Sequence, residues 1–391
     1  MSDIRFEGWL HRSGTGGVYQ DSAGNVGIAS TQPQTRLDIG NGGFQVGPTG
    51  IATVTTVNTT NLINATPLTN RNLIINGAMR IAQRGSSSTT NGYGDLDRWK
   101  HEYAGTDENP TFAQVSLTTS DTPYTLGITR TAKITNGDQT SDLQASSLIN
   151  FNQQIEAQNI RNSGWNYTSS SSYITLTFWV RASVEQNYHG FVKTQDGTNY
   201  VYPYETGTLS ANTWTKITKS IPGNSNLTIN DDTGGGFQVF PIFFGGTNYT
   251  SSSVTNNAWA TWASGGRSKD QTATWYNTND ATLEITGVQL EVGSVATPFE
   301  NRPVSDEIAR CQRYYQVGSS IGAGYGSANG YARAGCTYAT QMRATPTLTT
   351  TNSGSGSIIA TGTSNTGFYV TYGSLSGTSA GLFSFTAESE I

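Results

Sequence analysis

Apolar and polar residues alternate along the segment YITLTFWVRAS, and this alternation predicts a β-strand over 173–183. Successive side chains of a strand point to opposite faces, so residues two apart share a face. The apolar side chains of this shared face are Ile174, Leu176, Phe178 and Val180. A period of two residues with one apolar face indicates a strand packed against a core.

A second alternating segment, LEITGVQLEV, predicts another strand over 283–292. Its apolar side chains are Leu283, Ile285, Val288 and Leu290. The apolar face changes at Gly287, and a face change at a glycine is typical of a β-bulge. Gln289 and Glu291 then fall on the opposite face, so we expect them to point outward, toward a neighbour or a ligand. Together the two strands predict a β-sandwich over 72–303.

Residues 1–71 form a separate N-terminal region. It contains short strand-like pieces, and GVYQDSAGNVGIAS predicts a hairpin with its turn at Asp21–Asn25. A lone hairpin is only marginally stable in water, and the region has few large apolar side chains. We expect it to dock on another protein or to intertwine with copies of itself. An unfolded tail is the alternative.

Residues 304–391 begin with the chain's clearest helical segment, VSDEIARCQRYYQVG. Ser305 is a suitable N-cap and acidic residues occupy the first turn. Cys311 lies on the apolar face and is expected to be buried. The remainder returns to Gly/Ser/Thr-rich β patterning, in which MRATPTL and GFYVTYG predict strands.

Composition favours an all-β chain. Charged residues make up 13% of the 391 residues, about half of the usual share. The chain has 45 glycines, and Ser, Thr and Asn fill many of the remaining polar positions. These residues are poor helix formers and are common in strands, turns and loops.

The charge pattern excludes several classes of partner. The net charge is -5 and no run of Lys or Arg occurs, which argues against nucleic-acid binding through phosphate neutralisation. No apolar run approaches the roughly 20 residues of a membrane span. The N-terminus lacks the apolar segment of a secretory signal, and two cysteines do not make a disulfide scaffold. We expect a protein that folds in a cytoplasm and later meets the outside, as virus particles do.

The sequence predicts no enzyme. His11, His101 and His189 are far apart in sequence and have no metal-binding spacing, so we expect no metal and no catalytic residue, and we expect His101 and His189 to be surface groups. Asp231 and Asp232 lie in the turn-like NDDTGGG. A structural Ca²⁺ there is the alternative to a plain Asx-turn, and no other cofactor is expected. Glycoside hydrolysis needs two carboxylates across a cleft, and the sequence does not pair any.

Binding through aromatic side chains is the better-supported activity. In NYVYPYETG, Tyr200, Tyr202 and Tyr204 share one face of a predicted strand. Flat rings with a hydroxyl group suit stacking on sugars. Alternatively, the three rings pack under a loop or against another subunit.

A long loop-like segment over 245–277 holds a second group of aromatic residues. The group consists of Tyr249, Trp259, Trp262, Trp275 and Tyr276. Long loops without regular structure are often functional. We predict that Trp259, Trp262, Trp275 and Tyr276 contact a glycan, with subunit contact or simple packing as alternatives.

Three motifs resemble those of bacteriophage fibre proteins. GNVGIASTQPQTRLDIG resembles a short element of tail fibres, with Ala29 and Ser30 where Gly and Thr are commoner. NLIINGAMRIAQRG with GDLDRW, and ITGVQLEVGSVATPFENRP, resemble the ends of a phage-fibre jelly-roll domain that is similar to xylanase-associated carbohydrate-binding modules. ARCQRYY with MRATPT resembles fibre C-termini. In the central motif, Arg98 beside Trp99 predicts a guanidinium stacked on an indole.

The resemblance implies a phage virion structural protein of the tail-fibre type. It implies that residues 1–71 attach to other tail or baseplate proteins, that 72–303 form the jelly-roll sandwich, and that 304–391 add a helix and a small β tip. A homotrimer that binds host surface glycan without cleaving it is expected. The alternatives are an architectural baseplate, collar or capsid-surface protein, and, less favoured, a polysaccharide depolymerase.

Overall fold

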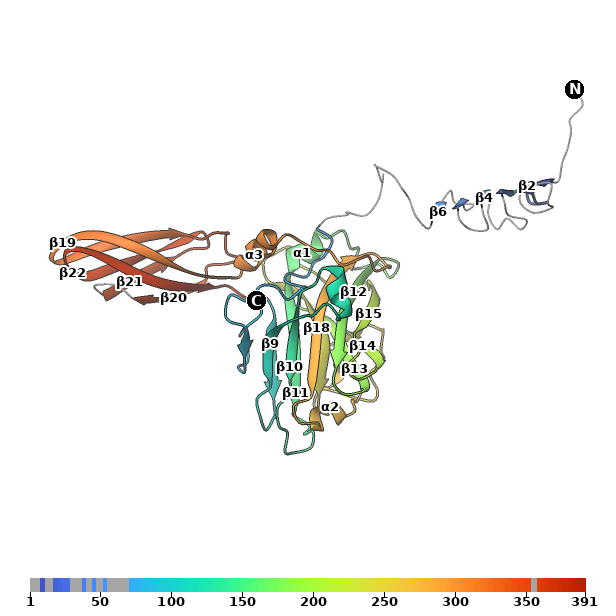
Figure 1. The fold of residues 1–391 in the computed structure, drawn as a ribbon, viewed down its shortest axis with the longest axis horizontal. Coiled ribbons are helices and arrows are strands. Elements are labelled where there is room, and N and C mark those ends of the chain that lie inside the picture. Colours follow the sequence, from blue (N-terminus) through green and yellow to red (C-terminus); the bar gives the residue numbers. More distant parts are fainter. Residues whose placement is uncertain are drawn as a thin grey trace, which may run out of the picture. The chain divides into compact units, whose positions relative to one another are not determined.

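The chain forms two compact units, Met1–Leu68 and Thr69–Ile391, in a computed structural model (Figure 1). The structure describes residues 8–10, 17–28, 37–39, 44–46, 52–54, 70–352 and 357–391. Within these ranges, no helix has the length and apolar character needed to cross a membrane. The expected division into three parts stays a prediction.

The first unit contains a sheet of six short strands in sequence order. These strands are β1 (Gly8–Leu10), β2 (Gly17–Gln20), β3 (Val26–Ile28), β4 (Leu37–Ile39), β5 (Phe44–Val46) and β6 (Ala52–Val54). The predicted hairpin is β2–β3, whose turn is closed by the Asp21 carboxylate accepting the backbone N–H groups of Ala23 and Asn25. The described side chains that make up hydrophobic cores all lie beyond residue 73.

The second unit contains a sandwich of two antiparallel six-stranded sheets, which confirms the all-β prediction (Figure 1). The first sheet has the order β15 (Thr215–Pro222), β12 (Tyr173–Ala182), β18 (Thr282–Val292), β10 (Arg130–Thr135), β9 (Thr111–Ser116) and β7 (Ser87–Ser88). The second has the order β17 (Ala260–Thr261), β14 (Tyr200–Leu209), β13 (Gln186–Thr194), β16 (Gly235–Gly245), β11 (Leu148–Glu156) and β8 (Lys100–Ala104).

The alternating segments place their apolar faces in the main core, as predicted. The four apolar residues of β12, from Ile174 to Val180, have no exposed surface. Gly287 in β18 has a left-handed backbone with φ of 61°, and the pairing with β12 shifts register beside it. The predicted bulge is therefore present, and it keeps both halves of β18 facing the core.

Helical structure is limited to short pieces. The helices are α1 (Ala157–Arg161), α2 (Thr274–Asn277) and α3 (Val304–Gln312), with 3-10 turns η1 (Thr122–Leu126) and η2 (Ser264–Gly266). The predicted helix is α3, but it is shorter than expected because the aromatic residues after Arg313 enter a strand. Pro303 occupies the N-cap position, so the assignment of Ser305 was wrong. Cys311 is buried, as predicted.

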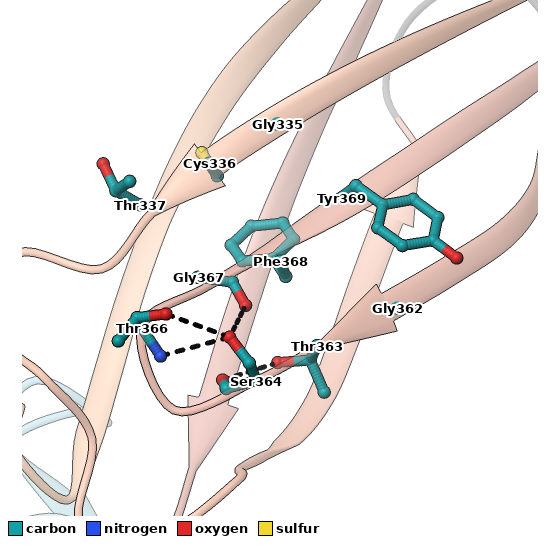
Figure 2. A pocket seen from close by; sticks show the side chains of 10 residues that line it. All are labelled: Gly335, Cys336, Thr337, Gly362, Thr363, Ser364, Thr366, Gly367, Phe368 and Tyr369. Carbon is teal, nitrogen blue, oxygen red and sulfur yellow. Dashed lines mark hydrogen bonds between the residues drawn. The ribbon is translucent and has the colours of Figure 1, made fainter.

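The C-terminal residues form a third sheet in which β22 (Gly367–Glu388) is central. Its neighbours are β19 (Tyr315–Thr337), β20 (Thr347–Asn352) and β21 (Ser357–Thr363). A small hydrophobic core of this sheet includes Val370 and Phe383 of β22 and Met342 of the loop before β20. An open groove of about 660 Å³ lies where β19, β21 and β22 meet, with Phe368 and Tyr369 among its lining residues (Figure 2).

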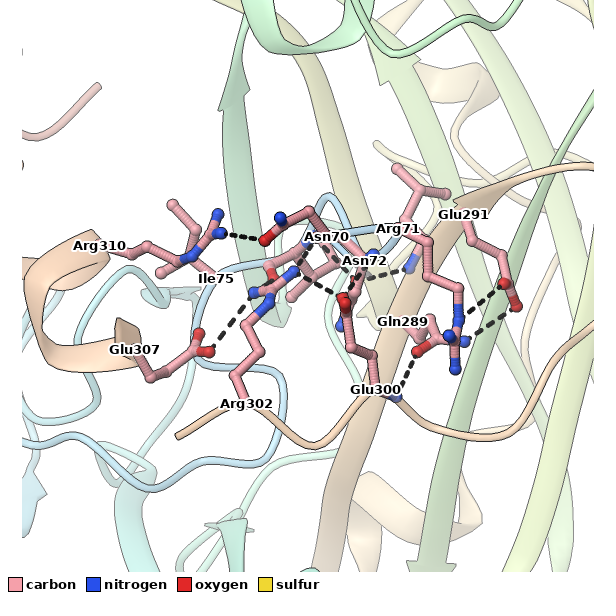
Figure 3. A network of polar contacts seen from close by, with 12 residues as sticks. Asn70, Arg71, Asn72, Ile75, Gln289, Glu291, Glu300, Arg302, Glu307 and Arg310 are labelled. Carbon is pink, nitrogen blue, oxygen red and sulfur yellow. Dashed lines mark hydrogen bonds and ion pairs between the residues drawn. The ribbon is translucent and has the colours of Figure 1, made fainter. Parts of the chain in front are cut away.

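A network of polar contacts ties the first residues of the sandwich to the segment that follows β18 (Figure 3). The Asn72 side chain donates to the carbonyl of Val288 at 3.1 Å and accepts the N–H groups of Ile74 and Leu290, each at 3.0 Å. Arg302 donates to the backbone carbonyls of Asn72 and Ile74. Both motif ends are therefore held together through buried hydrogen bonds.

The prediction that Gln289 and Glu291 point outward was wrong. They are buried, at 0% and 1% exposure, because the chain after β18 folds back over them. Glu291 accepts the N–H of Thr297. Gln289 accepts the N–H of Glu300 (Figure 3). Their polarity pairs the backbone of the covering segment rather than a ligand.

A second buried network joins the sandwich to the C-terminal strands. The Arg98 guanidinium, 1% exposed, is ion-paired with Glu390 and lies 3.4 Å over the Tyr314 ring. Burial alone would lower the pKa of Arg98, but the Glu390 carboxylate together with Tyr314 and Tyr93 raises it on balance. The predicted stacking of Arg98 on Trp99 was wrong, since Trp99 stacks on Phe151 at 4.5 Å.

Glu156 adds a second ionic contact at the same junction. Its carboxylate has no exposed surface and accepts hydrogen bonds from Arg313, at 2.7 and 2.8 Å, and from the Tyr314 hydroxyl. Burial alone would raise the pKa of Glu156, but the bonds from Arg313 and Tyr314 lower it on balance. The C-terminal strands are thus attached to the sandwich through buried ion pairs, in which each charge is stabilised by its partner.

We expect Asn72→Ala to destabilise the sandwich, because Val288 and Leu290 lose buried hydrogen-bond partners. The loss in the free energy of unfolding is expected to be about 2–4 kcal/mol, measured by urea denaturation followed by tryptophan fluorescence. Asn226→Ala, at an exposed position, is the matched control. Equal stability of the two variants would contradict the role of Asn72.

Glu390→Gln should leave the Arg98 charge buried without a carboxylate. Breaking a buried ion pair from one side costs about 3–5 kcal/mol, which urea denaturation of the full chain would detect. Glu388→Gln is the control, because the Glu388 side chain is 46% exposed and its nearest cation atom is 3.7 Å away. A Glu390→Gln variant as stable as Glu388→Gln would refute the proposed attachment.

Candidate functional site

The outer face of the β17–β14–β13–β16–β11–β8 sheet carries the groups that best suit recognition. Alternate residues of β11 and β16 enter the main core, among them Phe151 and Val239. Their neighbours Asn150, Asn152 and Gln238 turn to the other face. The alternation that builds the core thus also lays out this surface.

A second apolar cluster lies on this outer face, apart from the main core. It consists of Leu148, Phe191, Val201, Phe240 and Phe243, with the partly buried Tyr249 and Trp262 packed against them. Phe191 stacks on Phe240 at 4.0 Å, and Trp262 lies 5.9 Å from Phe191. The segment between β16 and α2 supplies Tyr249 and Trp262, so the cluster fixes part of that long loop on the sheet.

Three amide side chains form a chain of hydrogen bonds that ends on Glu102. Gln238 donates to Asn152 at 2.9 Å, Asn152 donates to Asn150 at 2.9 Å, and Asn150 donates to the Glu102 carboxylate at 3.2 Å. Lys100 forms an ion pair with the same carboxylate at 2.8 Å. The amides are buried, whereas the Glu102 side chain is 33% exposed. The buried amides therefore hold the Glu102 side chain in a position where it faces solvent.

An open groove of about 540 Å³ runs along the β8 edge of this face. Its lining residues are Asn91, Gly92, Lys100, His101, Glu102, Tyr103, Leu148 and Arg267. We call this the outer-face groove. A concave surface with a few polar groups beside apolar ones is the usual form of a small-ligand site.

Two cations lie against the Trp262 ring, and one of them, Arg267, lines this groove. The Lys193 ammonium lies 4.1 Å from the centre of the indole ring, and the Arg267 guanidinium carbon lies 5.2 Å from it. Arg267 also lies 4.5 Å over Tyr249. The negative face of an aromatic ring attracts cations, so the rings position both charges at the groove.

The environment disfavours the charge on both residues. Burial lowers the pKa of Lys193, and the nearby positive charge of Arg267 lowers it further. Burial likewise lowers the pKa of Arg267. Among the described residues, neither forms an ion pair with a carboxylate within 4.0 Å.

Four of the seven predicted glycan-binding aromatics belong to the sandwich core. Tyr202, Tyr204, Trp275 and Tyr276 are 0–3% exposed. Tyr204 donates its hydroxyl to the Phe240 carbonyl at 2.9 Å, and Tyr276 donates to the Gly105 carbonyl at 2.9 Å. These rings do share one face or one segment, as predicted, but they face inward. Their contact with a ligand is not proposed further.

The remaining three predicted aromatics are partly exposed, and one lies next to Arg267, which lines the groove. Tyr200 and Trp259 pack against the main core, with Trp259 donating to the Pro222 carbonyl at 2.7 Å. Trp262 is the one next to Lys193 and Arg267. Sequence reasoning missed both cations, although Lys193 shares its strand face with Phe191 and this spacing was readable.

The expectation that His101 and His189 lie at the surface was wrong for both, and His11 lies outside the described residues. His101 is fully buried, 2.7 Å from the Asp95 carboxylate, and stacks on Phe112 at 4.0 Å. His189 is 4% exposed. His101 therefore supports the inner wall of the groove.

The predicted acidic turn behaves as a turn. Asp232 accepts the N–H of Gly234 at 2.9 Å, and Asp231 accepts from the Asn162 side chain at 2.9 Å. In the part of the chain that the structure describes, no three His, Cys, Asp or Glu side chains gather in a metal-binding group.

The groove of the C-terminal sheet is a weaker candidate. Several of its hydroxyl groups are already paired: Ser364 donates to the Gly367 carbonyl (Figure 2), and the Thr363 hydroxyl bonds to the Tyr338 hydroxyl. Its lining holds no charged side chain. The outer-face groove combines charge, amides and an aromatic ring.

The sandwich is similar to carbohydrate-binding proteins of known structure, at low identity. A putative sugar-binding protein from Bacteroides thetaiotaomicron matches with 13% identity, 57% of this chain, 100% of that chain and a TM-score of 0.32. The N-terminal cellulose-binding domain of Cellulomonas fimi β-1,4-glucanase C matches with 10% identity, 56% of this chain, 99% of that chain and a TM-score of 0.27.

Tailspike protein 4 of bacteriophage CBA120, in its enzymatically active domain, matches with 12% identity and a TM-score of 0.30. The match covers 57% of this chain and 21% of the tailspike chain. No model of a known protein family and no curated protein matches the sequence. These likenesses assign no family, so function is argued from the chain's own residues.

The lowered pKa of Lys193 is testable by competitive amine labelling with peptide mass analysis across a pH series. Because Arg267 disfavours the protonated amine, Arg267→Gln should move the titration of Lys193 to higher pH. Lys216→Gln, a change of one positive charge on β15, is the control and should leave it in place. An unchanged Lys193 titration in Arg267→Gln would show that the two charges do not interact.

Proposed function

We propose that the chain is a phage virion structural protein of the tail-fibre type that binds host surface glycan through the outer-face groove. The observation that carries this proposal is Trp262, a partly exposed indole beside a groove that also offers Glu102 and two cations. Sugar rings present apolar faces that stack on aromatic rings and hydroxyls that bond charged and amide groups.

The assignment to a virion is supported by the sequence. Motifs at both ends of 72–303 resemble those of phage-fibre jelly-roll domains, and the structure gives these motifs a shared task in closing the sandwich. On this proposal, residues 1–71 attach the chain to other tail or baseplate proteins, the chain is a homotrimer, and it is assembled into particles in the host cytoplasm.

We propose recognition without turnover. Hydrolysis of a glycosidic bond uses two carboxyl groups on either side of the scissile bond. Glu102 is the carboxylate among the described residues that line the groove, and it already accepts bonds from Lys100 and Asn150. This arrangement favours binding over depolymerase activity.

The second candidate function is architectural. In this case the groove would contact a neighbouring virion protein instead of a glycan. Exposed aromatic and cationic groups also suit protein contacts. Purified protein that labels no host cells, yet incorporates into particles, would favour this alternative.

Trp262→Ala should weaken binding by about tenfold or more, because loss of one stacked ring costs at least about 1.4 kcal/mol. We would measure binding of labelled full-length protein to host cells and to a microarray of bacterial surface glycans.

The matched control is Trp214→Ala, which removes a partly exposed indole that stacks with Arg181 beside β15. Undiminished binding in Trp262→Ala, or equal loss in both variants, would count against the groove as the recognition surface.

A further inference from the structure

The outer-face groove, taken with Lys193 and Trp262 next to its lining residue Arg267, has an excess of positive charge on an acidic protein. Lys100 is neutralised by Glu102, which is 2.8 Å away. Lys193 and Arg267 form no ion pair within 4.0 Å among the described residues and feel Glu102 only at longer range, although the whole chain carries a net charge of -5. The excess is therefore local to this groove.

Neither cation lies in a position where water fully hydrates its charge. Arg267 lies against the rings of Tyr249 and Trp262, and its Nε is buried without a hydrogen-bond partner. Lys193 lies against the same indole. Two like charges that share one ring repel each other, and an anion placed between or beside them removes that repulsion.

We propose that the ligand of the outer-face groove is an anionic glycan, whose carboxylate or phosphate is bound by Arg267 and Lys193 while a sugar ring contacts Trp262. This inference rests on the proposed glycan-binding function and specifies its substrate class. A guanidinium matches the planar oxygens of a carboxylate or a phosphate, and an ammonium adds a point charge.

Glu102 sharpens this selection. Its carboxylate is held on the groove wall by Asn150 and Lys100. Because Glu102 and Lys100 neutralise each other, this end of the groove offers acceptors for hydroxyl donors but no net positive charge for an anion. The anionic group is therefore directed to the Arg267 and Lys193 end, with sugar hydroxyls toward Glu102.

The test uses matched polymers that differ only in charge. Full-length protein is titrated against polygalacturonate and its fully methyl-esterified form, and against phosphomannan and the same mannan after dephosphorylation. Poly-glutamate provides an anion without sugar. Biolayer interferometry at two salt concentrations measures each affinity.

We expect binding to a polymer that bears the anion, at least about tenfold tighter than to its neutral counterpart, and weaker at high salt. Arg267→Gln and Lys193→Gln should each remove about tenfold of that preference. Arg267→Lys should retain part of it, and Lys216→Gln should retain all of it. Because Lys193→Gln leaves the Arg267 stacking in place, it tests charge without disturbing the loop.

The contrary outcomes separate two failures. Equal binding to charged and neutral polymers, unchanged in Arg267→Gln and Lys193→Gln, would overturn the anionic ligand and leave glycan binding intact. Equal binding to poly-glutamate would overturn it as well, since sugar would then play no part. Binding to no glycan in the polymer set or on the microarray would overturn the proposed function together with this inference.

Discussion

The hydrogen bonds of Asn72 and Arg302 are the contacts on which the sandwich depends. They join the first residues of the sandwich to the end of β18, so that the beginning and the end of this domain lie against the same core. Gly77 allows this approach, because a Cβ there would lie 2.1 Å from the Val288 carbonyl oxygen. Buried polar groups are costly unless paired, so this edge closes in one arrangement.

The alternating strands were predictable from sequence because one face of each is buried. Residues such as Phe178 and Ile285 repeat with a period of two, and Gly287 marked the bulge. The same period does not say which face is buried when both faces carry large side chains. Tyr202 and Tyr204 share a face with each other, as predicted, yet that face is the core. Gln289 and Glu291 are buried because the irregular segment after β18 covers them. The alternation of a strand does not predict where such a segment lies.

The candidate site was harder to predict because its parts come from elements that meet only in the folded chain. Lys193 belongs to β13, Glu102 to β8, and Arg267 to a loop without periodicity. Trp262 was identified as an aromatic residue of that loop, but nothing in the sequence distinguished it from Trp275, which is buried. The distinction arises from packing: Trp275 donates its indole N–H to the Thr282 carbonyl inside the sandwich, whereas Trp262 lies over the outer face.

The charged side chains discussed above fall into two groups, those paired with an opposite charge and those held against aromatic rings. Arg98 is enclosed with Glu390, and Glu156 with Arg313, so each charge is satisfied within the chain and attaches the C-terminal strands. Lys193 and Arg267 are only partly enclosed, and aromatic rings rather than carboxylates surround them. An aromatic ring holds a cation in place while leaving its charge unneutralised. A protein that uses carboxylates to fasten its own parts and rings to present its free cations keeps those cations available for an anion from outside.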